Sequence, residues 1–171
     1  MMIIRKFKDK DAEQISALIG RNFVEINSKD YPLEEMIKKS KEFSPDKVRN
    51  RAANGHMYVA CEGDTIIGTG TISDFLGNPT ESILLTIFVL PEYHGRGIGR
   101  KIIDTLEKDE YFTRANRIEV CASITATGFY KKCGYQYKNQ IKILDAEGHY
   151  KMEKWRCKKW DYQELRKEIF R

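Results

Sequence analysis

The stretch FVLPEYHGRGIGRK, residues 88–101, is the most informative part of this sequence, and the rest of the chain can be interpreted outward from it. Residues 82–90 are almost continuously apolar, which is typical of a central strand covered on both faces. Apolar residues then recur at helical spacing over 97–110 and predict a helix. Three glycines stand between the two elements. Each glycine costs a helix or strand interior about 0.5–1 kcal/mol relative to alanine, so we expect this loop to hold a ligand.

The loop has the properties of a phosphate-binding turn. The first N–H groups of a helix have no partner within the helix, and the helix dipole adds partial positive charge beside them. Arg96, Arg100 and Lys101 add full charges. The dinucleotide-binding motif and the P-loop motif are both excluded, because each requires a glycine where Arg100 stands. A turn without a ligand is the alternative. We favour a pyrophosphate cradle, in which Gly97 and Gly99 are glycines because the anion lies against their backbone.

Strands and helices alternate along the rest of the chain, which predicts one mixed α/β domain. Gly63-Asp64 reads as a hairpin turn, GNPT at 77–80 as another turn, and Ser44-Pro45 as the start of a helix. The predicted strands are 2–7, 56–62, 65–75, 82–90 and 117–123, with a final hairpin of 136–144 and 149–155. The predicted helices begin at Asp9, Pro32 and Pro45 and also cover 97–110, 126–133 and 158–170.

The composition describes a globular protein of 171 residues, with 41% hydrophobic and 32% charged residues. No apolar run approaches the roughly 20 residues of a membrane span, and the N-terminus lacks the apolar stretch of a signal peptide. We therefore expect a cytoplasmic protein without a membrane partner. The cysteines at 61, 121, 133 and 157 and the three histidines show no metal-ligand spacing. No metal site is predicted, and the thiols are expected to be free and mostly buried.

The net charge of +5 is unevenly spread. Residues 151–171 carry +4, and the rest of the chain carries +1. A nucleic-acid-binding function would have to depend on this basic tail alone. Acidic residues are interspersed through the tail, and the body has no basic-aromatic stripe, so we expect no nucleic-acid partner.

Two blocks of the sequence resemble the GNAT superfamily of N-acetyltransferases. The first is His94-Gly95-Arg96-Gly97-Ile98-Gly99, which matches the pattern [QR]-x-x-G-x-[GA] except that His94 replaces Arg or Gln. The second lies one helix and one strand further on, with Ser123 in place of the usual Asn. It matches the family at Ala126, Phe129, Tyr130, Gly134 and Tyr135.

The resemblance implies a mixed central sheet with helices on both faces and an extra C-terminal helix. Two neighbouring parallel strands, 82–90 and 117–123, would splay apart at its centre. The resemblance covers residues 1–154 as an acetyltransferase domain. Residues 155–171 would then be a basic helical extension packed on the same domain.

The resemblance also implies that acetyl-CoA, or coenzyme A, binds in the notch between the splayed strands. The pantetheine arm would pair with the strand edge near Phe88 to Leu90, and the pyrophosphate would lie on the N–H groups of residues 95–100. The N–H near Val89 would stabilise the oxyanion that develops on the thioester. The implied cofactor-binding residues are Phe88, Val89, Leu90, His94, Gly95, Arg96, Gly97, Ile98, Gly99, Arg100, Phe129 and Tyr130.

The implied chemistry needs an acid and a base. The family motif places Tyr130 to protonate the departing thiolate, although packing alone would also explain a Phe-Tyr pair on a short helix. Glu81, just before the central strand, is our choice for the base that deprotonates the amine. Asp74, Glu119 and an ordered water are the alternatives.

The expected function is direct transfer of an acetyl group from acetyl-CoA to a primary amine of a small molecule or protein. A catalytically silent acyl-CoA-binding or sensor module is the alternative, and turnover separates the two. The acceptor is not identified by the sequence, and a homodimer is left open. The acceptor site of the family would involve residues 32–53 and the last hairpin. Aromatic residues there that could line it or belong to the core are Tyr31, Phe43, His56, Tyr135, Tyr137 and Tyr150.

Overall fold

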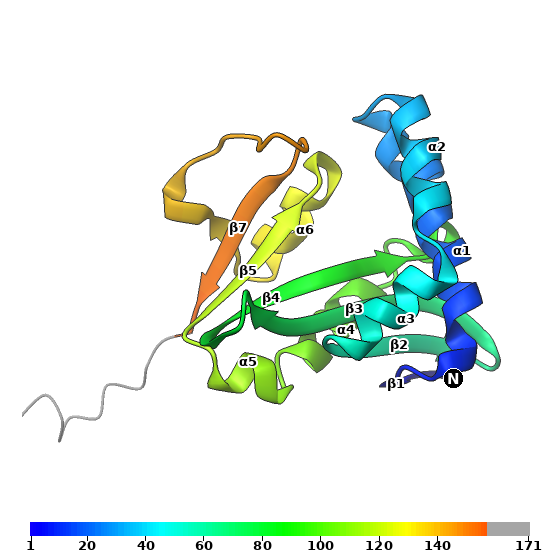
Figure 1. Cartoon of the computed structure of the whole chain (residues 1–171), viewed down its shortest axis with the longest axis horizontal. Helices are drawn as coiled ribbons and strands as arrows, with labels where there is room; N and C mark the ends of the chain where they lie inside the picture. Colours follow the sequence, from blue (N-terminus) through cyan, green and yellow to red (C-terminus); the bar gives the residue numbers. More distant parts are fainter. Residues whose placement is uncertain (157–171) are drawn as a thin grey trace, which may run out of the picture.

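The computed structural model describes residues 1–156 (Figure 1). The predicted helix 158–170, and the predicted extension from residue 157 onward, lie outside the described residues. Within that part of the chain, one sheet has the strand order β1-β2-β3-β4-β5-β7-β6. The pairing of β4 with β5 is parallel, and every other neighbouring pair is antiparallel. The predicted mixed α/β fold is confirmed.

The strands follow the predicted segments closely in the first half of the chain. The β2–β3 hairpin turns at Gly63-Asp64, as expected. The strand bounds are β1 (Met2–Lys6), β2 (His56–Glu62), β3 (Thr65–Phe75), β4 (Asn78–Val89), β5 (Arg117–Ala122), β6 (Gln136–Tyr137) and β7 (Tyr150–Trp155).

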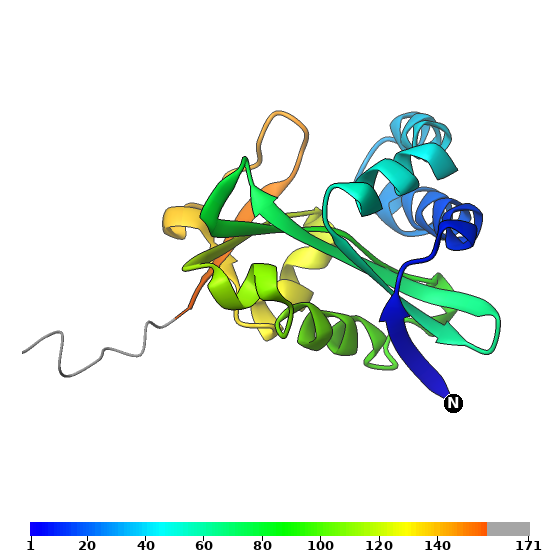
Figure 2. The ribbon, with the colours of Figure 1, turned by 60° about the horizontal axis from the view of Figure 1, so that its bottom comes forward.

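The helices cover both faces of the sheet (Figure 2). One hydrophobic core joins the first and third helices to β2, and a second core joins the fourth and sixth helices to the other face. The helix bounds are α1 (Ala12–Arg21), α2 (Leu33–Glu42), α3 (Pro45–Ala53), α4 (Ile98–Leu106), α5 (Glu110–Arg114) and α6 (Thr127–Lys132). After α1 the chain continues as a π-helical segment, Asn22–Ile26, and a 3-10 turn, Asn27–Lys29.

Helix α4 is held against the sheet by its apolar face and by small residues beneath it. Ile98, Ile102, Ile103 and Leu106 are all buried. A Cβ added to Gly70 of β3 would lie 2.5 Å from the side chain of Ile102. The glycines of β3 therefore let α4 approach the sheet closely, which sets where the glycine loop at its N-terminus lies.

The central strands separate because β4 carries a bulge. Thr69 pairs with Phe88 but Thr71 pairs with Leu85, so β4 holds one extra residue between them. At the bulge Thr86 has a φ of +51°, which is rare for a β-branched residue. Parallel pairing with β5 covers only residues 81–84 of β4. Beyond the bulge β4 continues to Val89 without β5, and the predicted splay is confirmed.

Three predicted boundaries are wrong. The helix predicted over 97–110 ends at Leu106, and a separate helix, α5, begins at Glu110, where Asp109 caps it and accepts a hydrogen bond from Tyr111 N–H. The turn predicted at 77–80 falls one residue earlier, at Leu76-Gly77, where both φ values are positive. The final hairpin is mostly a loop, because positive φ values at Asn139 and Gln140 end β6 after two residues.

Candidate functional site

A cleft of about 640 Å³ opens where β4 and β5 separate. Its walls come from the segment that follows α1, the end of β4, the glycine loop with α4, and α6 with the turn that leads into it. Residues of both sequence blocks that resemble the GNAT family therefore line the same cleft. Its lining residues are Asn22, Ile26, Asn27, Ile87, Phe88, Val89, Tyr93, His94, Gly95, Gly97, Ile98, Gly99, Arg100, Ser123, Thr125, Ala126, Phe129, Tyr130, Lys132 and Cys133.

The glycine loop forms an open cradle at the N-terminus of α4. Gly97 caps the helix, and its carbonyl accepts from Lys101 N–H at 3.1 Å. The N–H groups of residues 98–100 precede this first helical hydrogen bond and are the orphan donors of the helix. A Cβ on Gly95 or Gly97 would meet nothing within 4 Å. The space beside these donors is therefore free for an anion.

The two glycines of the motif have different physical reasons. Gly97 has a φ of +76°, so the turn itself requires glycine there. Gly99 lies within α4, and a Cβ on it would be 3.2 Å from the ring of Phe129. The expectation that a bound anion alone explains both glycines is wrong, because the positive φ of Gly97 favours glycine in the backbone and a Cβ on Gly99 would crowd the ring of Phe129.

The cations of the loop are partly engaged within the protein. The guanidinium of Arg96 lies over the ring of Tyr93 at 4.7 Å. Arg100 donates to Asp104 at 2.8 Å, which raises the pKa of Arg100, and also to the carbonyl of Lys132 at 3.2 Å. The side chain of Arg100 thus links α4 to α6 across one end of the cleft.

The carbonyl of Val89, the last residue of β4, is held by two side chains. It accepts from Asn22 Nδ2 at 2.9 Å, and His94 Nε2 lies 2.8 Å away. A carbonyl cannot donate, so His94 carries its proton on Nε2. Both lone pairs of this oxygen are then used. If the predicted pairing of pantetheine with the strand edge near Phe88 to Leu90 used this carbonyl, one of the two side chains would have to move.

Asn22 is a site residue that sequence reasoning missed. Its side chain is buried and also donates to the carbonyl of Leu18 at 2.9 Å. In the sequence it is the one polar residue in the apolar face of the first predicted helix, and this interruption is the feature that could have indicated a functional role. Ser123 and Thr125 also line the cleft without having been predicted as ligand-binding residues.

The predicted cofactor-binding residues gather in one place. All of them line the cleft except Leu90 and Arg96, which directly adjoin it in the chain. Leu90 instead continues the pairing of β4 with β3, because its N–H donates to Ile67 O at 2.9 Å.

Tyr130 lies on α6 and is almost completely buried, with 5% of its surface exposed. Its ring packs edge-on against Phe129, with 5.2 Å between the ring centres. Burial raises the pKa of Tyr130 far above its ordinary value. The side chain is therefore a neutral phenol at any ordinary pH and can act only as a proton donor or hydrogen-bonding group.

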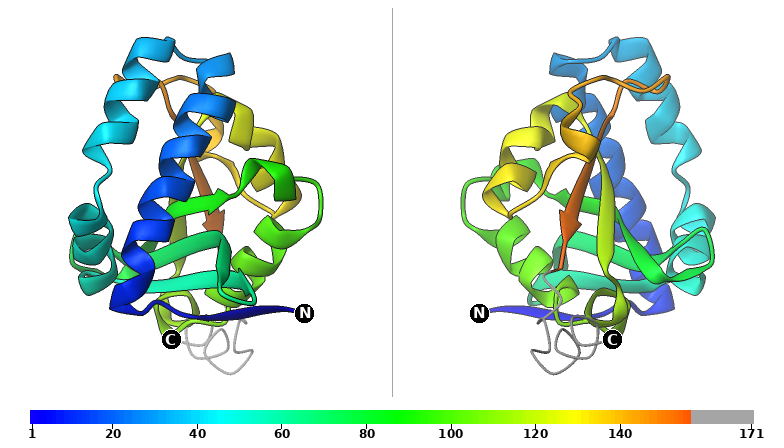
Figure 3. Two further views of the ribbon diagram at one scale, coloured as in Figure 1. Left: turned by 90° about the vertical axis from the view of Figure 1, so that its right-hand side faces the viewer. Right: turned by 90° about the vertical axis from the view of Figure 1, so that its left-hand side faces the viewer.

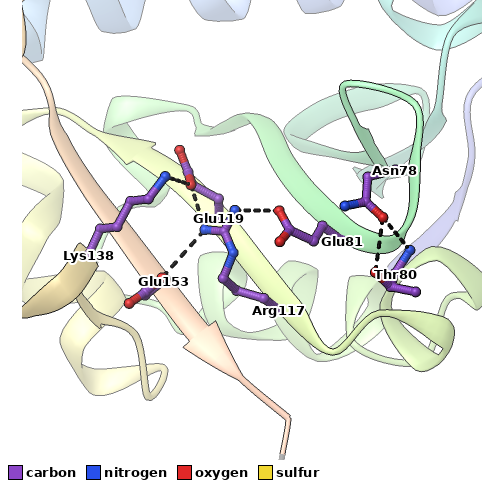
Figure 4. Close-up of polar contacts among 7 residues, drawn as sticks. All are labelled: Asn78, Thr80, Glu81, Arg117, Glu119, Lys138 and Glu153. Carbon is purple, nitrogen blue, oxygen red and sulfur yellow. Dashed lines mark hydrogen bonds and ion pairs between the residues drawn. The ribbon is translucent and has the colours of Figure 1, made fainter.

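Glu81 lies in an ion cluster (Figure 4), and it is not among the residues that line the cleft. Arg117 binds Glu81 at 2.5 Å, Glu119 at 2.6 Å and Glu153 at 3.4 Å, and Lys138 binds Glu119 at 2.7 Å. Burial opposes ionisation of Glu119, but the hydrogen bonds from Arg117 and Lys138 outweigh it and hold the pKa of Glu119 below its usual range. Glu119 is therefore held as a carboxylate by the buried Arg117 and the partly exposed Lys138.

The structure does not bring Glu81 to the cleft. Glu81 is seven residues before Phe88 on β4, which corresponds to about 23 Å at ~3.3 Å per residue. The second carboxylate considered as a base, Glu119, belongs to the same cluster. The third, Asp74, lies on β3 opposite Ser82 and is also outside the cleft lining.

The aromatic residues considered for an acceptor site separate into four groups. Phe43 and Tyr135 are buried in the core, and His56 Nδ1 lies 2.8 Å from Asp109. Tyr137 and Tyr150 pack edge-on with 5.3 Å between ring centres. Tyr31 contacts the loop that precedes β7.

The thiols of the described residues are free. Cys61 and Cys133 are free and buried, Cys121 is free and exposed, and Cys157 lies outside the described residues. Between residues 1 and 156, no three His, Cys, Asp or Glu side chains gather closely enough to hold a metal ion. In the same part of the chain no helix has the length and apolarity to cross a membrane.

Comparison with known proteins gives a family match over the middle of the chain. Residues 53–137 match the family model of an acetyltransferase (GNAT) domain. No curated protein matches the chain by sequence.

Several solved structures share the fold. One is a PaiA N-acetyltransferase from Thermoplasma acidophilum in complex with coenzyme A, with TM-score 0.79 and 19% identity, covering 91% of this chain and 99% of that one. Another is a GCN5-related N-acetyltransferase (aminotransferase, class II) from Rhodopseudomonas palustris, with TM-score 0.73 and 23% identity, covering 90% and 95%. A third, a GNAT-family acetyltransferase from Staphylococcus aureus, has TM-score 0.68 and 15% identity, covering 91% and 99%. At these identities the likeness establishes the fold.

Proposed function

Residues 53–137 of the chain form an acetyltransferase domain of the GNAT family, and on this premise we propose that the protein transfers an acetyl group from acetyl-CoA directly to a primary amine. One observation carries the proposal. The open glycine cradle and the orphan N–H groups of α4 lie at the edge of a cleft between two separated parallel strands. That arrangement offers an anion site next to a channel at a strand edge.

The residues present fit coenzyme A by their chemistry. The cleft volume is within the usual range of about 300–1,000 Å³ for small-ligand sites. At one end are the N–H groups of residues 98–100, with Arg96 beside the loop. Phe88, Ile98 and Phe129 provide apolar walls in the same cleft. A ligand with a pyrophosphate and a long, less polar arm matches this combination of an anion site and apolar walls, and the complex of the Thermoplasma structure with coenzyme A supports the choice.

Within this proposal Tyr130 protonates the departing thiolate. Acetyl-CoA supplies the acetyl group in activated form, as a thioester. The raised pKa of Tyr130 keeps its hydroxyl protonated and able to donate a hydrogen bond to the departing sulfur. Because a thiol, with an ordinary pKa of about 8.5, is a stronger acid than this phenol, the raised pKa does not itself favour the proton transfer. Glu81 stays the predicted base, but its ion pair with Arg117 and its separation from Phe88 favour the alternative of an ordered water.

The experiment that tests the function has two parts. Calorimetric titration with acetyl-CoA measures binding, and release of free coenzyme A thiol is then followed with a panel of primary amines, from small diamines and amino sugars to lysine peptides. We expect binding and amine-dependent thiol release. Binding without release for any amine would favour the acyl-CoA-binding module, and absence of binding would contradict both functions.

A further inference from the structure

The hydroxyl of Tyr31 connects two segments that lie far apart in the sequence. It accepts a hydrogen bond from Ile124 N–H at 3.0 Å and donates one to the carbonyl of Gly148 at 2.7 Å. Burial raises the pKa of Tyr31, so the hydroxyl keeps the proton that it donates. One side chain from the connection between α1 and α2 thus touches both the β5–α6 turn and the loop before β7.

The first partner belongs to the wall of the cleft. Ile124 stands between Ser123 and Thr125, which both line the cleft, and it begins the 3-10 turn that leads into α6. An N–H at the start of such a turn has no partner within the turn, and Tyr31 supplies one. Tyr31 therefore helps to hold the turn that precedes α6, the helix that carries Tyr130.

The second partner belongs to the loop of residues 141–149. The carboxylate of Asp145 accepts from Glu147 N–H at 3.0 Å and from His149 N–H at 2.9 Å, which makes the end of the loop compact. Gly148 has a φ of +78°, and a Cβ on it would lie 3.0 Å from the ring of Tyr31. Figure 3 shows this loop and the α1–α2 connection together at the top of the molecule.

The connection that carries Tyr31 also borders the cleft. It begins at Asn22, whose side chain binds the carbonyl of Val89 at the end of β4. Ile26 and Asn27 line the cleft on the way, and Tyr31 then reaches the turn after β5. Residues 22–31 thus bridge the two separated strands, and a ligand in the cleft would contact this bridge directly.

We propose that Tyr31 is a positioning residue that couples occupancy of the cleft to the placement of loop 141–149. The inference rests on the proposed function, in which coenzyme A occupies the cleft. A ligand there restrains both the 22–31 bridge and the 123–126 turn, and the Tyr31 hydroxyl passes that restraint to Gly148. The loop carries the exposed side chains of Ile141, Ile143 and Leu144. Binding of coenzyme A would thus fix the position of this apolar surface before the amine acceptor, the second substrate, binds.

Hydrogen exchange of the full chain, measured by mass spectrometry with and without saturating coenzyme A, tests the coupling. In the wild type we expect slower exchange at residues 95–101, the direct contact, and at 146–151, the coupled segment. The second effect should be about fivefold, as expected for the net contribution of one hydrogen bond. In Tyr31→Phe the slowing at 95–101 should persist, and the slowing at 146–151 should be lost. A purely structural role of Tyr31 would not remove this dependence on the ligand.

Two further variants make the result interpretable. Tyr137→Phe removes a hydroxyl from a ring that packs on Tyr150 in β7, and it should behave as the wild type. Gly148→Ala displaces the loop end from Tyr31 and should uncouple it as Tyr31→Phe does. Equal slowing at 146–151 in the wild type and Tyr31→Phe would overturn the proposal, as would wild-type slowing confined to 95–101. No slowing at either segment would instead refute the binding of coenzyme A, and the coupling with it.

Discussion

Gly97 and Gly99 lie two residues apart in one motif, yet an added methyl group would meet different surroundings at each. At Gly97 the Cβ would meet nothing within 4 Å, whereas at Gly99 it would lie 3.2 Å from the ring of Phe129. The positive φ of Gly97 adds a backbone cost of about 1–2 kcal/mol for alanine. At Gly99 the better helix propensity of alanine, up to ~1 kcal/mol, opposes the crowding.

The two alanine variants should therefore differ in ligand selectivity. We expect Gly97→Ala to lower the free energy of unfolding by about 1–2 kcal/mol and to weaken coenzyme A binding about tenfold or more, with little effect on pantetheine, which lacks the pyrophosphate. Gly99→Ala should change stability by less than ~1 kcal/mol and weaken both ligands alike, because Phe129 lines the cleft. Urea unfolding and calorimetry measure these quantities. Parallel losses for both ligands in Gly97→Ala would contradict an anion cradle.

Tyr130 allows a test of the proposed acid at the same scale. Tyr130→Phe keeps the packing against Phe129 and removes only the hydroxyl. We expect kcat for the best amine of the panel to fall by about 10²-fold or more, the range of general acid catalysis, while the Kd for coenzyme A stays within about twofold. An equal loss of affinity and turnover would assign Tyr130 to binding.

At the scale of elements, the bulge of β4 creates the cleft and the ion cluster closes the opposite end of the strand pair. Parallel pairing of β4 with β5 starts at Glu81 and Arg117, inside the cluster, and stops at Leu84, just before the bulge. The cluster joins β4, β5 and β7 through the guanidinium of Arg117, which is largely buried. The strands are thus tied together at one end and separated at the other.

Arg117→Met should reveal the cost of leaving these carboxylates without their shared cation. Removing one partner of a buried ion pair costs about 3–5 kcal/mol. Because Lys138 still pairs with Glu119 in the variant, we expect the free energy of unfolding, measured with urea at pH 7.5, to fall by about 3 kcal/mol, the lower end of this range. Glu81→Gln, which leaves the other pairs intact, is the milder comparison. A loss below 1 kcal/mol would contradict a structural role for the cluster.

The same variant has a defined pH dependence. The pKa of Glu119 is lowered in the folded wild type, so its contribution is present above the ordinary carboxyl pKa of about 4.3 and is lost as pH falls through the folded value. In Arg117→Met burial favours the protonated form of Glu119. Lowering the pH therefore reduces the destabilisation of the variant. The difference in unfolding free energy between wild type and variant should therefore be smaller at pH 4.5 than at pH 7.5. A difference that grows toward acid pH would contradict this sign.

At the scale of the whole molecule, the proposed ligand should stabilise the fold. Coenzyme A that binds only the native state contributes about 2.7 kcal/mol at 100 times its Kd. For a chain of 171 residues each kcal/mol corresponds to roughly 2–4 °C, so the Tm should rise by about 5–10 °C. Pantetheine should raise it less, because it lacks the anion that the cradle of α4 would hold. An unchanged Tm at millimolar acetyl-CoA would refute the proposed function.

Much of the architecture follows from local patterns that the sequence carries by itself. The apolar run 82–90, the helical spacing after Gly97 and the Gly63-Asp64 turn depend on neighbours within a few residues, and each corresponds to an element of the structure. The family resemblance implied which residues would gather around one cleft, and most of them belong to a strand, turn and helix that are contiguous in the chain.

Only the tertiary structure decided the features that depend on residues distant in sequence. Asn22 reaches Val89 across 67 positions, and Tyr31 reaches Gly148 across 117, which no local periodicity encodes. The carboxylate chosen from the sequence as a base, Glu81, is paired with Arg117, because the parallel register of β4 and β5 sets them side by side. The physical reason is that chain contiguity fixes local backbone geometry, whereas the partners of a buried polar group depend on which strands and helices pack together.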